Sequence, residues 1–205
     1  MFRDRLDAAE RLAHELETVK GQNPLILAIP RGGVPMGRYL ADALEGELDV
    51  VLVRKVGAPG NPEFAIGAVS EDGSVHLDEA AARLCSDDWL ASEITRQREL
   101  IKTRRSHYTP IRPPIDPAGR IVVVVDDGSA TGATMAAALA TLRQRNPQRL
   151  IAALGVGSRD ALAHLKTLAD DVVCLAAPSH FQAVGQFFDD FAQVRDEDVL
   201  DLLPP

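Results

Sequence analysis

The chain has 205 residues, of which 46% are hydrophobic and 25% charged, as expected for a folded globular domain rather than a disordered chain. Its formal net charge of −8 argues against a general binder of nucleic acid or anionic membranes, because both need a basic face on the protein. No apolar run approaches the roughly 20 residues of a membrane span, the N-terminus lacks a signal-peptide pattern, and Cys85 and Cys174 match no metal or redox spacing. We therefore expect a cytoplasmic domain without nucleic-acid or membrane partners, in which a local site holds any phosphate-bearing ligand.

The N-terminal part of the chain predicts a helix, a strand and a second helix. The first helix covers residues 4–20 and is closed by Gly21. A continuous apolar run at 25–29 predicts a buried strand. The segment 30–33 is expected to form a turn that leads from this strand into a helix ending at Leu44. The apolar positions of the first helix recur at helical spacing: Leu6, Ala9, Ala13 and Leu16.

The next part predicts strands. A second apolar strand covers 48–53 and is followed by the basic residues Arg54 and Lys55. Runs at 64–69 and 75–77 flank an Asp-Gly pair, which predicts a β-hairpin.

The C-terminal half alternates regularly. Ser86 begins a long helix with acidic residues in its first turn, and the proline-rich segment 110–117 ends it. Three further strands, at 121–125, 150–156 and 172–175, alternate with helices at 133–145 and 159–168. This alternation predicts an α/β fold in which a doubly wound, mainly parallel sheet has helices on both faces.

The segment after the strand at 121–125 carries the clearest chemical pattern. It begins with two acids, Asp126 and Asp127, and continues into a helix through small residues: Gly128, Ser129, Ala130, Thr131, Gly132, Ala133 and Thr134. Ligands bind beyond the carboxyl ends of parallel strands, and here backbone N–H groups, hydroxyls and a helix N-terminus form a candidate phosphate site. The acids suit the hydroxyls of a sugar phosphate. A Walker loop needs Gly-Lys-Ser/Thr and a dinucleotide fingerprint has its acid after the glycines, so neither fits.

The sequence VVVVDDGSATGAT resembles the phosphoribosyl-pyrophosphate signature of the type I phosphoribosyltransferases. The resemblance implies that Asp126 and Asp127 contact the ribose hydroxyls and that the loop 128–134 binds the 5′-phosphate. It is strong over residues 21–77 and 120–176, and weak over the rest. As a whole the chain looks most like stand-alone members of the family, whose accepting base is generally unassigned.

Two other segments agree with this resemblance. LAIPRGGV resembles the family's pyrophosphate loop, in which Arg31, Gly32 and Gly33 would face the diphosphate, often with an unusual peptide geometry. Arg54 and Lys55 resemble the basic pair that reaches the same group. Taken alone, each segment also fits an ordinary turn or exposed charges, but all of them are expected at one edge of the sheet.

The resemblance also implies a mobile arm at 56–77, where Asn61 and Glu63 either contact ligand or lie in solvent. The arginine-rich stretch 96–105 is interpreted as a solvated helix face or a dimer edge.

A C-terminal hood would cover the base. Its aromatic residues, Phe181, Phe187 and Phe188, either stack on the base or pack within the hood. The chain is thus predicted to be a single domain with a core at 21–176, a helical insertion at 79–118 and the hood at 177–205.

The resemblance implies transfer of ribose 5-phosphate from phosphoribosyl pyrophosphate to a nitrogenous base, with Asp126, Asp127, Arg31 and Lys55 as catalytic residues. Mg²⁺ is expected to arrive on the substrate diphosphate rather than in a protein cage. Ala130 occupies the position of the aspartate of hypoxanthine–guanine enzymes, which weakens that assignment. The alternative is a non-catalytic regulatory protein that binds the same ligand. A homodimer is compatible with the sequence, which does not determine the oligomeric state.

Overall fold

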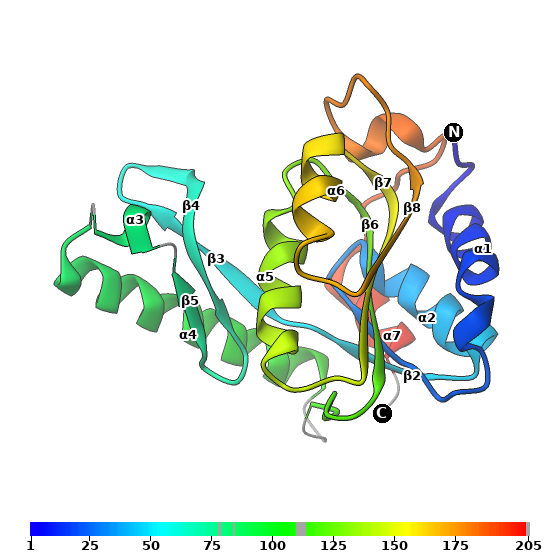
Figure 1. Cartoon of the computed structure of the whole chain (residues 1–205), viewed down its shortest axis with the longest axis horizontal. Helices are drawn as coiled ribbons and strands as arrows, with labels where there is room; N and C mark the ends of the chain where they lie inside the picture. The colour runs from blue at the N-terminus through cyan, green and yellow to red at the C-terminus, as the bar shows by residue number, and fades with distance from the viewer. Residues whose placement is uncertain (78, 84, 110–113, 204–205) are drawn as a thin grey trace.

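The computed structural model describes residues 1–77, 79–83, 85–109 and 114–203, except for the side chains of residues 62–65, 76, 79 and 81. Two sheets make up the framework (Figure 1). A five-stranded sheet has the order β2-β1-β6-β7-β8, and a three-stranded sheet has the order β3-β4-β5. Every pair in the larger sheet is parallel, which confirms the predicted α/β class.

The strands of the larger sheet are β1 (Leu25–Ala28), β2 (Glu47–Val50), β6 (Ile121–Ser129), β7 (Arg149–Gly157) and β8 (Asp171–Ala176). All of β1 and the first five residues of β6 are buried, because helices cover both faces of a parallel sheet and its strands become continuously apolar. The strands that meet at the centre of the sheet are therefore the ones with the most regular apolar runs.

Two pairs of helices cover the faces of this sheet. On one face lie α1 (Arg5–Glu15) and α2 (Gly33–Leu44), and on the other lie α5 (Ala133–Arg143) and α6 (Arg159–Leu165) (Figure 1). Val123 and Val125 belong to the apolar cluster on the α1–α2 face, whereas Val122 and Val124 belong to the cluster on the α5 face. Since side chains alternate along a strand, the side chains of the two acids that follow Val125 point to opposite faces of the sheet.

The helix predicted over 4–20 is shorter in the structure. It is capped by Asp4, whose side chain accepts from the N–H of Asp7, and a 3-10 helix follows at Glu17–Val19. Its buried face includes Ala8, Ala9 and Leu12, while Leu6 is 51% exposed, so Leu6 was wrongly placed on the apolar stripe.

The smaller sheet contains β3 (Val53–Ala58), β4 (Asn61–Ser70) and β5 (Val75–Leu77), and we call it the arm sheet. The predicted hairpin is confirmed, since β4 and β5 are antiparallel. The strand predicted over 48–53 is present but shorter: β2 ends at Val50, and the chain leaves the larger sheet before β3 begins. Arg54 and Lys55 therefore lie within β3 rather than beyond the end of a core strand.

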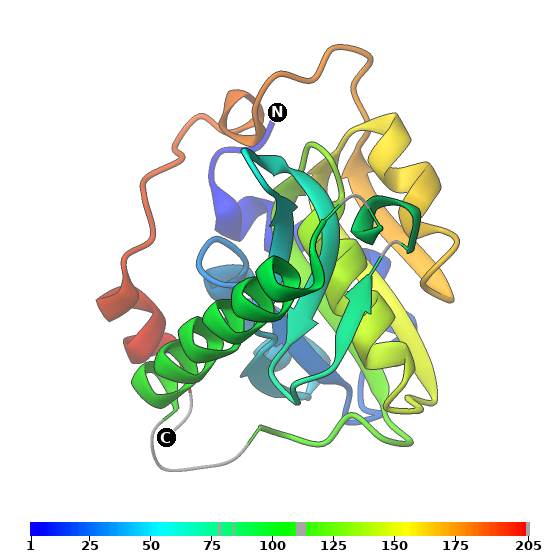
Figure 2. The same ribbon diagram turned by 90° about the vertical axis from the view of Figure 1, so that its left-hand side faces the viewer.

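Two helices follow the arm sheet, α3 (Glu79–Ala82) and α4 (Asp87–Tyr108). Ser86 caps α4 by accepting from the N–H of Trp89, as its position predicted. The long α4 runs across the arm sheet (Figure 2). Residues 110–113 of the predicted proline-rich linker lie outside the described part of the chain.

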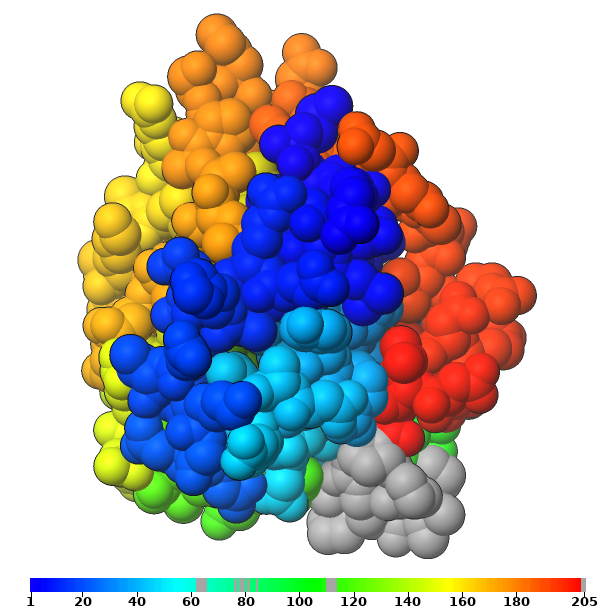
Figure 3. Space-filling model, turned by 90° about the vertical axis from the view of Figure 1, so that its right-hand side faces the viewer, coloured from blue at the N-terminus to red at the C-terminus, as the bar shows by residue number. Residues whose placement is uncertain are grey.

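Beyond β8 the chain forms a 3-10 helix at Val184–Phe187 and the helix α7 (Asp196–Leu202). Phe2 pairs with Phe188 in an isolated parallel bridge, which joins the start of the chain to its C-terminal segment. Figure 3 shows α1 and α2 side by side, with the C-terminal segment in orange and red along their edge. α7 packs against α2 and α4. No helix in the described residues is long and apolar enough to cross a membrane.

Candidate active site

The turn 30–33 lies directly against the end of β6. The N–H of Ile29 donates to the carbonyl of Val125 at 2.9 Å, and the N–H of Gly33 donates back to the carbonyl of Ile29 at 3.0 Å. A Cβ atom at Gly33 would lie 2.5 Å from the carbonyl oxygen of Val125, and one at Gly32 would collide with the carboxylate of Asp127. Only glycine permits this approach, which brings together the two segments that the sequence placed at one edge. The Pro30–Arg31 peptide is cis, an unusual geometry of the kind that the family resemblance implied.

Asp127 points toward the N-terminal helix. Its Oδ2 accepts from Nε of Arg5 at 2.8 Å, and both side chains are largely buried. Arg5 also donates to the carbonyl of Ala192 at 2.7 Å and lies over the ring of Phe191 at 3.9 Å. No local pattern pointed to Arg5, because 122 residues separate it from Asp127.

Asp126 has a different environment. It is half-buried, and its Oδ1 accepts from the N–H of Asp127 at 2.9 Å. Burial, together with the negative charge of Asp127, raises the pKa of Asp126 well above its ordinary value. Burial also raises the pKa of Asp127, while the charge of Arg5 opposes that rise. Among the described residues Asp126 has no ion-pair partner, so it is the acid that gains more from a ligand with hydroxyl donors or positive charge.

The loop 128–134 leads from β6 into α5. Gly132 has a φ of 78° and caps the helix, a conformation that favours glycine. The hydroxyl of Ser129 accepts from the N–H of Gly132 at 2.9 Å, and that of Thr131 accepts from the N–H of Ala133 at 3.4 Å. These two N–H groups are thus paired within the loop, a detail the sequence did not predict. In the described part of the chain, the N–H groups of Thr131 and Thr134 have no hydrogen-bond partner, and both loop hydroxyls keep a proton to donate.

The Arg31 guanidinium lies beside the C-terminal helix. Its terminal nitrogen is 3.9 Å from Oδ2 of Asp196, and the Tyr108 hydroxyl donates to Oδ1 of Asp196 at 2.6 Å. Burial and the hydrogen bond to Asp196 raise the pKa of Tyr108 to about 12, so the hydroxyl stays a donor at neutral pH. Asp196 therefore lies close to Arg31, a contact that the sequence did not predict.

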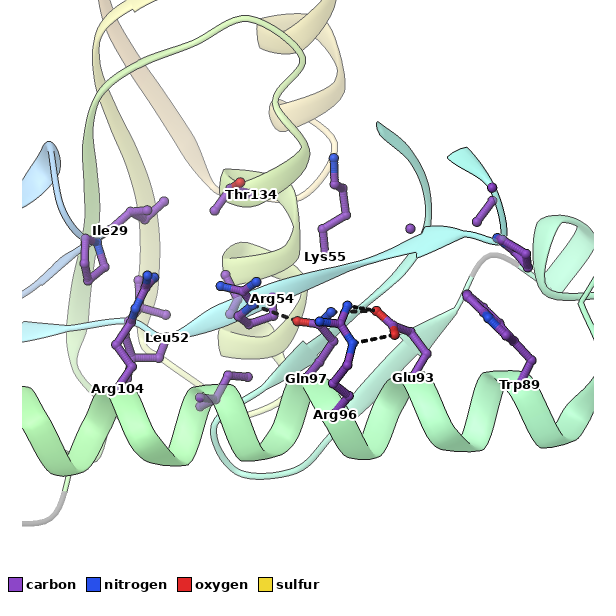
Figure 4. Close-up of a pocket in the computed structure, with 18 residues that line it drawn as sticks. Ile29, Leu52, Arg54, Lys55, Trp89, Glu93, Arg96, Gln97, Arg104 and Thr134 are labelled. Atoms are coloured by element: carbon purple, nitrogen blue, oxygen red, sulfur yellow. Dashed lines mark hydrogen bonds and ion pairs between the residues drawn. The ribbon is translucent and has the colours of Figure 1, made fainter. Parts of the chain in front are cut away.

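Arg54 and Lys55 reach the same region from the arm sheet. Both line a cavity of about 590 Å³ whose wall also includes Pro30 and Thr134 (Figure 4). The structure thus places the basic pair beside the turn 30–33 and the first turn of α5, although the pair comes from a different sheet than predicted.

Comparison with known proteins is consistent with this geometry. The family model described as "Phosphoribosyl transferase domain" matches residues 3–191. The chain belongs to this family. Two Mycobacterium tuberculosis proteins named "Putative phosphoribosyl transferase", from strains H37Rv and CDC 1551, are each 40% identical to it over 99% of its length. The chain spans 46% of the length of each of these relatives.

Solved structures with the same fold include a protein of similar size. The crystal structure of TT1426 from Thermus thermophilus has a TM-score of 0.90 and 48% identity, covering 98% of this chain and 97% of TT1426. The AQ2163 protein from Aquifex aeolicus has a TM-score of 0.51 and 13% identity, covering 84% of this chain and 74% of AQ2163. The second comparison shows the shared fold alone.

In the predicted hood of this phosphoribosyl transferase domain, aromatic side chains pack against one another and against the N-terminal Phe2. Phe188 is buried between Phe2, at a ring distance of 5.1 Å, and Phe191, at 5.0 Å. Phe188 thus packs within the hood, whereas Phe181 and Phe187 are half-buried and contact each other at 5.4 Å. From the arm, Asn61 is exposed, and the side chain of Glu63 lies outside the described residues.

Proposed function

We propose that the chain transfers ribose 5-phosphate from phosphoribosyl pyrophosphate to a nitrogenous base, with release of pyrophosphate. The observation that carries the proposal is the contact of the turn 30–33 with the acid pair at the end of β6. A turn with a cation and free backbone groups suits a diphosphate, and acids beside a helix N-terminus suit a ribose 5-phosphate. Family membership supports the same reaction class.

In this reaction the acidic and the basic residues of the site would have different roles. Positive charge develops on the ribose ring as the diphosphate leaves, and Asp126 and Asp127 would stabilise it. Arg5 neutralises part of the charge on Asp127, so we expect Asp126 to make the larger contribution. Arg31, Arg54 and Lys55 would offset the negative charge that grows on the leaving diphosphate.

Mg²⁺ fits this arrangement as a companion of the diphosphate. The described residues contain no cluster of three or more His, Cys, Asp or Glu that could hold a metal ion, and Mg²⁺ in proteins is often held by one or two carboxylates together with substrate phosphates. Asp126 is half-buried at the strand end and could supply one such carboxylate. When bound, the ion would neutralise charge on the leaving group.

Binding without turnover is the alternative. Asp127 is paired with Arg5, and Arg31 lies near Asp196, so two groups proposed to meet ligand also have partners in the protein. A regulatory protein could use the exchange of such partners as its signal.

A panel of nucleobases with phosphoribosyl pyrophosphate and Mg²⁺ separates the two functions. We expect pyrophosphate release that depends on one class of base and stops when a chelator removes Mg²⁺. Tight binding of phosphoribosyl pyrophosphate without release for any base would favour the regulatory function. The cytoplasmic location and the homodimer stay predictions, and size-exclusion chromatography with light scattering tests the latter.

A further inference from the structure

Arg5 joins three parts of the molecule that are distant in the sequence. It is the first residue of α1, and its Nε donates to Oδ2 of Asp127 at 2.8 Å. Its terminal nitrogen donates to the carbonyl of Ala192 at 2.7 Å, and its guanidinium lies over the ring of Phe191 at 3.9 Å. Only 12% of the Arg5 side chain is exposed, so this cation lies out of solvent between the acid pair and the hood.

The part of the hood beside Arg5 is bound to the N-terminus by backbone hydrogen bonds. The N–H of Phe2 donates to the carbonyl of Phe187 at 2.8 Å, and the N–H of Asp189 donates back to the carbonyl of Phe2 at 2.9 Å. Figure 3 shows this C-terminal segment, in orange and red, along the edge of α1. The Arg5 side chain extends the connection to the end of β6, so we expect a displacement of the hood to reach Asp127.

The carboxylate of Asp127 lies between Arg5 and the turn 30–33. The oxygen that accepts from Arg5, Oδ2, is also the atom with which a Cβ at Gly32 would collide. The hydrogen bond from Arg5 therefore fixes the carboxylate against the turn. A group that acts on a reacting ring has to be held in one direction, because small errors in geometry cost much of the rate.

Arg5 also affects the charge of both acids. Burial raises the pKa of Asp126 and of Asp127, and the positive charge of Arg5 opposes the rise at each of them. The charged residue of the turn 30–33 is Arg31, which lies near Asp196, and the hood residues that contact Arg5 are neutral. In the described residues, the strands and helices that flank this end of β6 place uncharged side chains there. Arg5 is therefore the cation that keeps the acid pair ionised.

Building on the proposed transfer reaction, we propose that Arg5 is a positioning residue that keeps the acid pair charged, directs Asp127 at the turn 30–33 and links both to the hood over the base. The guanidinium suits this place because it offers several N–H donors in one plane and a flat face for an aromatic ring. A lysine would supply the charge alone. A protonated acid cannot stabilise positive charge on the ribose, so loss of Arg5 would confine turnover to higher pH.

The first test measures the ionisation of the acids and needs no turnover. NMR of isotope-labelled aspartate carboxyl groups, followed across pH in the full chain, should show both acids of Arg5→Gln titrating at higher pH than in the original chain. Arg5→Lys keeps the charge and should titrate close to the original. Arg11→Gln is the matched control, because Arg11 also belongs to α1 and lies over an aromatic ring, that of Phe2, but pairs with Asp7. It should titrate like the original chain.

The second test isolates the link to the hood. In Arg5→Lys the amine cannot bond both Asp127 and the carbonyl of Ala192 in the geometry of the guanidinium. We expect the amide hydrogen of Asp189 to exchange about 10-fold faster in this variant, as for loss of a charged hydrogen bond. With an accepted base, Arg5→Lys should raise the KM for the base and keep the pH profile, whereas Arg5→Gln should move the acid limb of kcat to higher pH.

Equal titration of the acids in Arg5→Gln and Arg11→Gln would overturn the proposal, and so would a rate that falls by the same factor at every pH in Arg5→Gln. Unchanged exchange at Asp189 in Arg5→Lys would overturn the link to the hood. Failure of the proposed function is a separate result: the original chain would release no pyrophosphate with any base. The titration and the exchange measurement would still decide whether Arg5 controls the acid pair and the hood.

Discussion

The five-stranded sheet and the arm sheet place their functional residues in different ways. The larger sheet is buried on both faces, and its loops are fixed by backbone contacts such as that of Gly33 with Val125. The arm sheet buries Val56 and Val69, but most of β3 is half-exposed. Its basic residue Arg54 is held by a side chain of α4, that of Gln97. Under the proposed function, the larger sheet would set the position of the sugar phosphate, and the arm sheet would bring Arg54 and Lys55 to the diphosphate.

The junction between the two regions depends on Arg105. Its guanidinium donates to Asp49 at 2.8 Å and to the carbonyl of Val50 at 2.9 Å, and it pairs with Glu71 beyond the end of β4. Asp49 is 1% exposed, so removal of Arg105 takes a cation away from a buried carboxylate. Arg105→Met should lower the free energy of unfolding by about 3 kcal/mol or more.

Denaturant unfolding checks this prediction with two probes. Trp89 of α4 is the only tryptophan in the chain, so its fluorescence reports on the arm region while circular dichroism reports on the whole fold. We expect the fluorescence transition of Arg105→Met to come first. Coincident transitions with unchanged stability would show that the arm does not depend on this junction. Lys102→Met, in which an exposed cation of α4 is replaced, is the control.

Two glycines allow a direct comparison of the regions. At Gly33 an added methyl group meets backbone atoms of β6, whereas at Gly60, in the turn between β3 and β4, no atom lies within 4 Å. Gly33→Ala should cost about 1–3 kcal/mol of stability and weaken diphosphate binding. Gly60 has a positive φ of 74°, so Gly60→Ala should cost about 1 kcal/mol. Thermal unfolding measures both, and a larger loss at Gly60 would reverse the comparison.

Arg31 should distinguish the diphosphate from the sugar phosphate. Arg31→Ala should weaken phosphoribosyl pyrophosphate binding about 10-fold, because one charged contact is lost, and should leave ribose 5-phosphate binding almost unchanged. Calorimetry with both ligands provides the measurement. An equal loss for both ligands would show that the turn 30–33 does not bind the diphosphate.

The two acids should respond differently to substitution. The raised pKa of Asp126 means that the folded chain binds more protons than the unfolded chain from about pH 4 up to that raised value. The contribution of Asp126 to stability therefore falls as the pH rises through this window. Asp126→Asn should remove this fall and stabilise the ligand-free chain at neutral pH. Asp127→Asn should stabilise it less, because burial also raises the pKa of Asp127 but the charge of Asp127 pairs with Arg5, which would keep only a neutral amide oxygen as its partner. Unfolding at several pH values tests both, and equal effects would contradict the assigned environments.

The local sequence pattern was enough to predict those elements whose structure depends on residues adjacent in the chain. The apolar runs predicted β1 and β6, and the small residues after Asp127 predicted the loop that enters α5. Contacts between distant residues could not be predicted. Arg5 reaches Asp127 across 122 residues and Arg105 reaches Asp49 across 56, and the second contact lies where β2 ends and the chain leaves the larger sheet. The position of Arg54 depends on the same departure, because Arg54 lies in β3 directly after it. The sequence therefore revealed the phosphate loop but not the strand that carries Arg54.

The central claim is that the acid pair acts on the developing charge of a ribose ring. Its most direct test is the rate of base-dependent pyrophosphate release by Asp126→Asn, measured together with the calorimetric affinity for phosphoribosyl pyrophosphate and Mg²⁺. Asparagine keeps the size and a carbonyl acceptor but removes the charge, so we predict a modest loss of affinity and a loss of turnover on the order of 10²-fold or more. Unchanged turnover in both Asp126→Asn and Asp127→Asn, with an accepted base present, would contradict the claim.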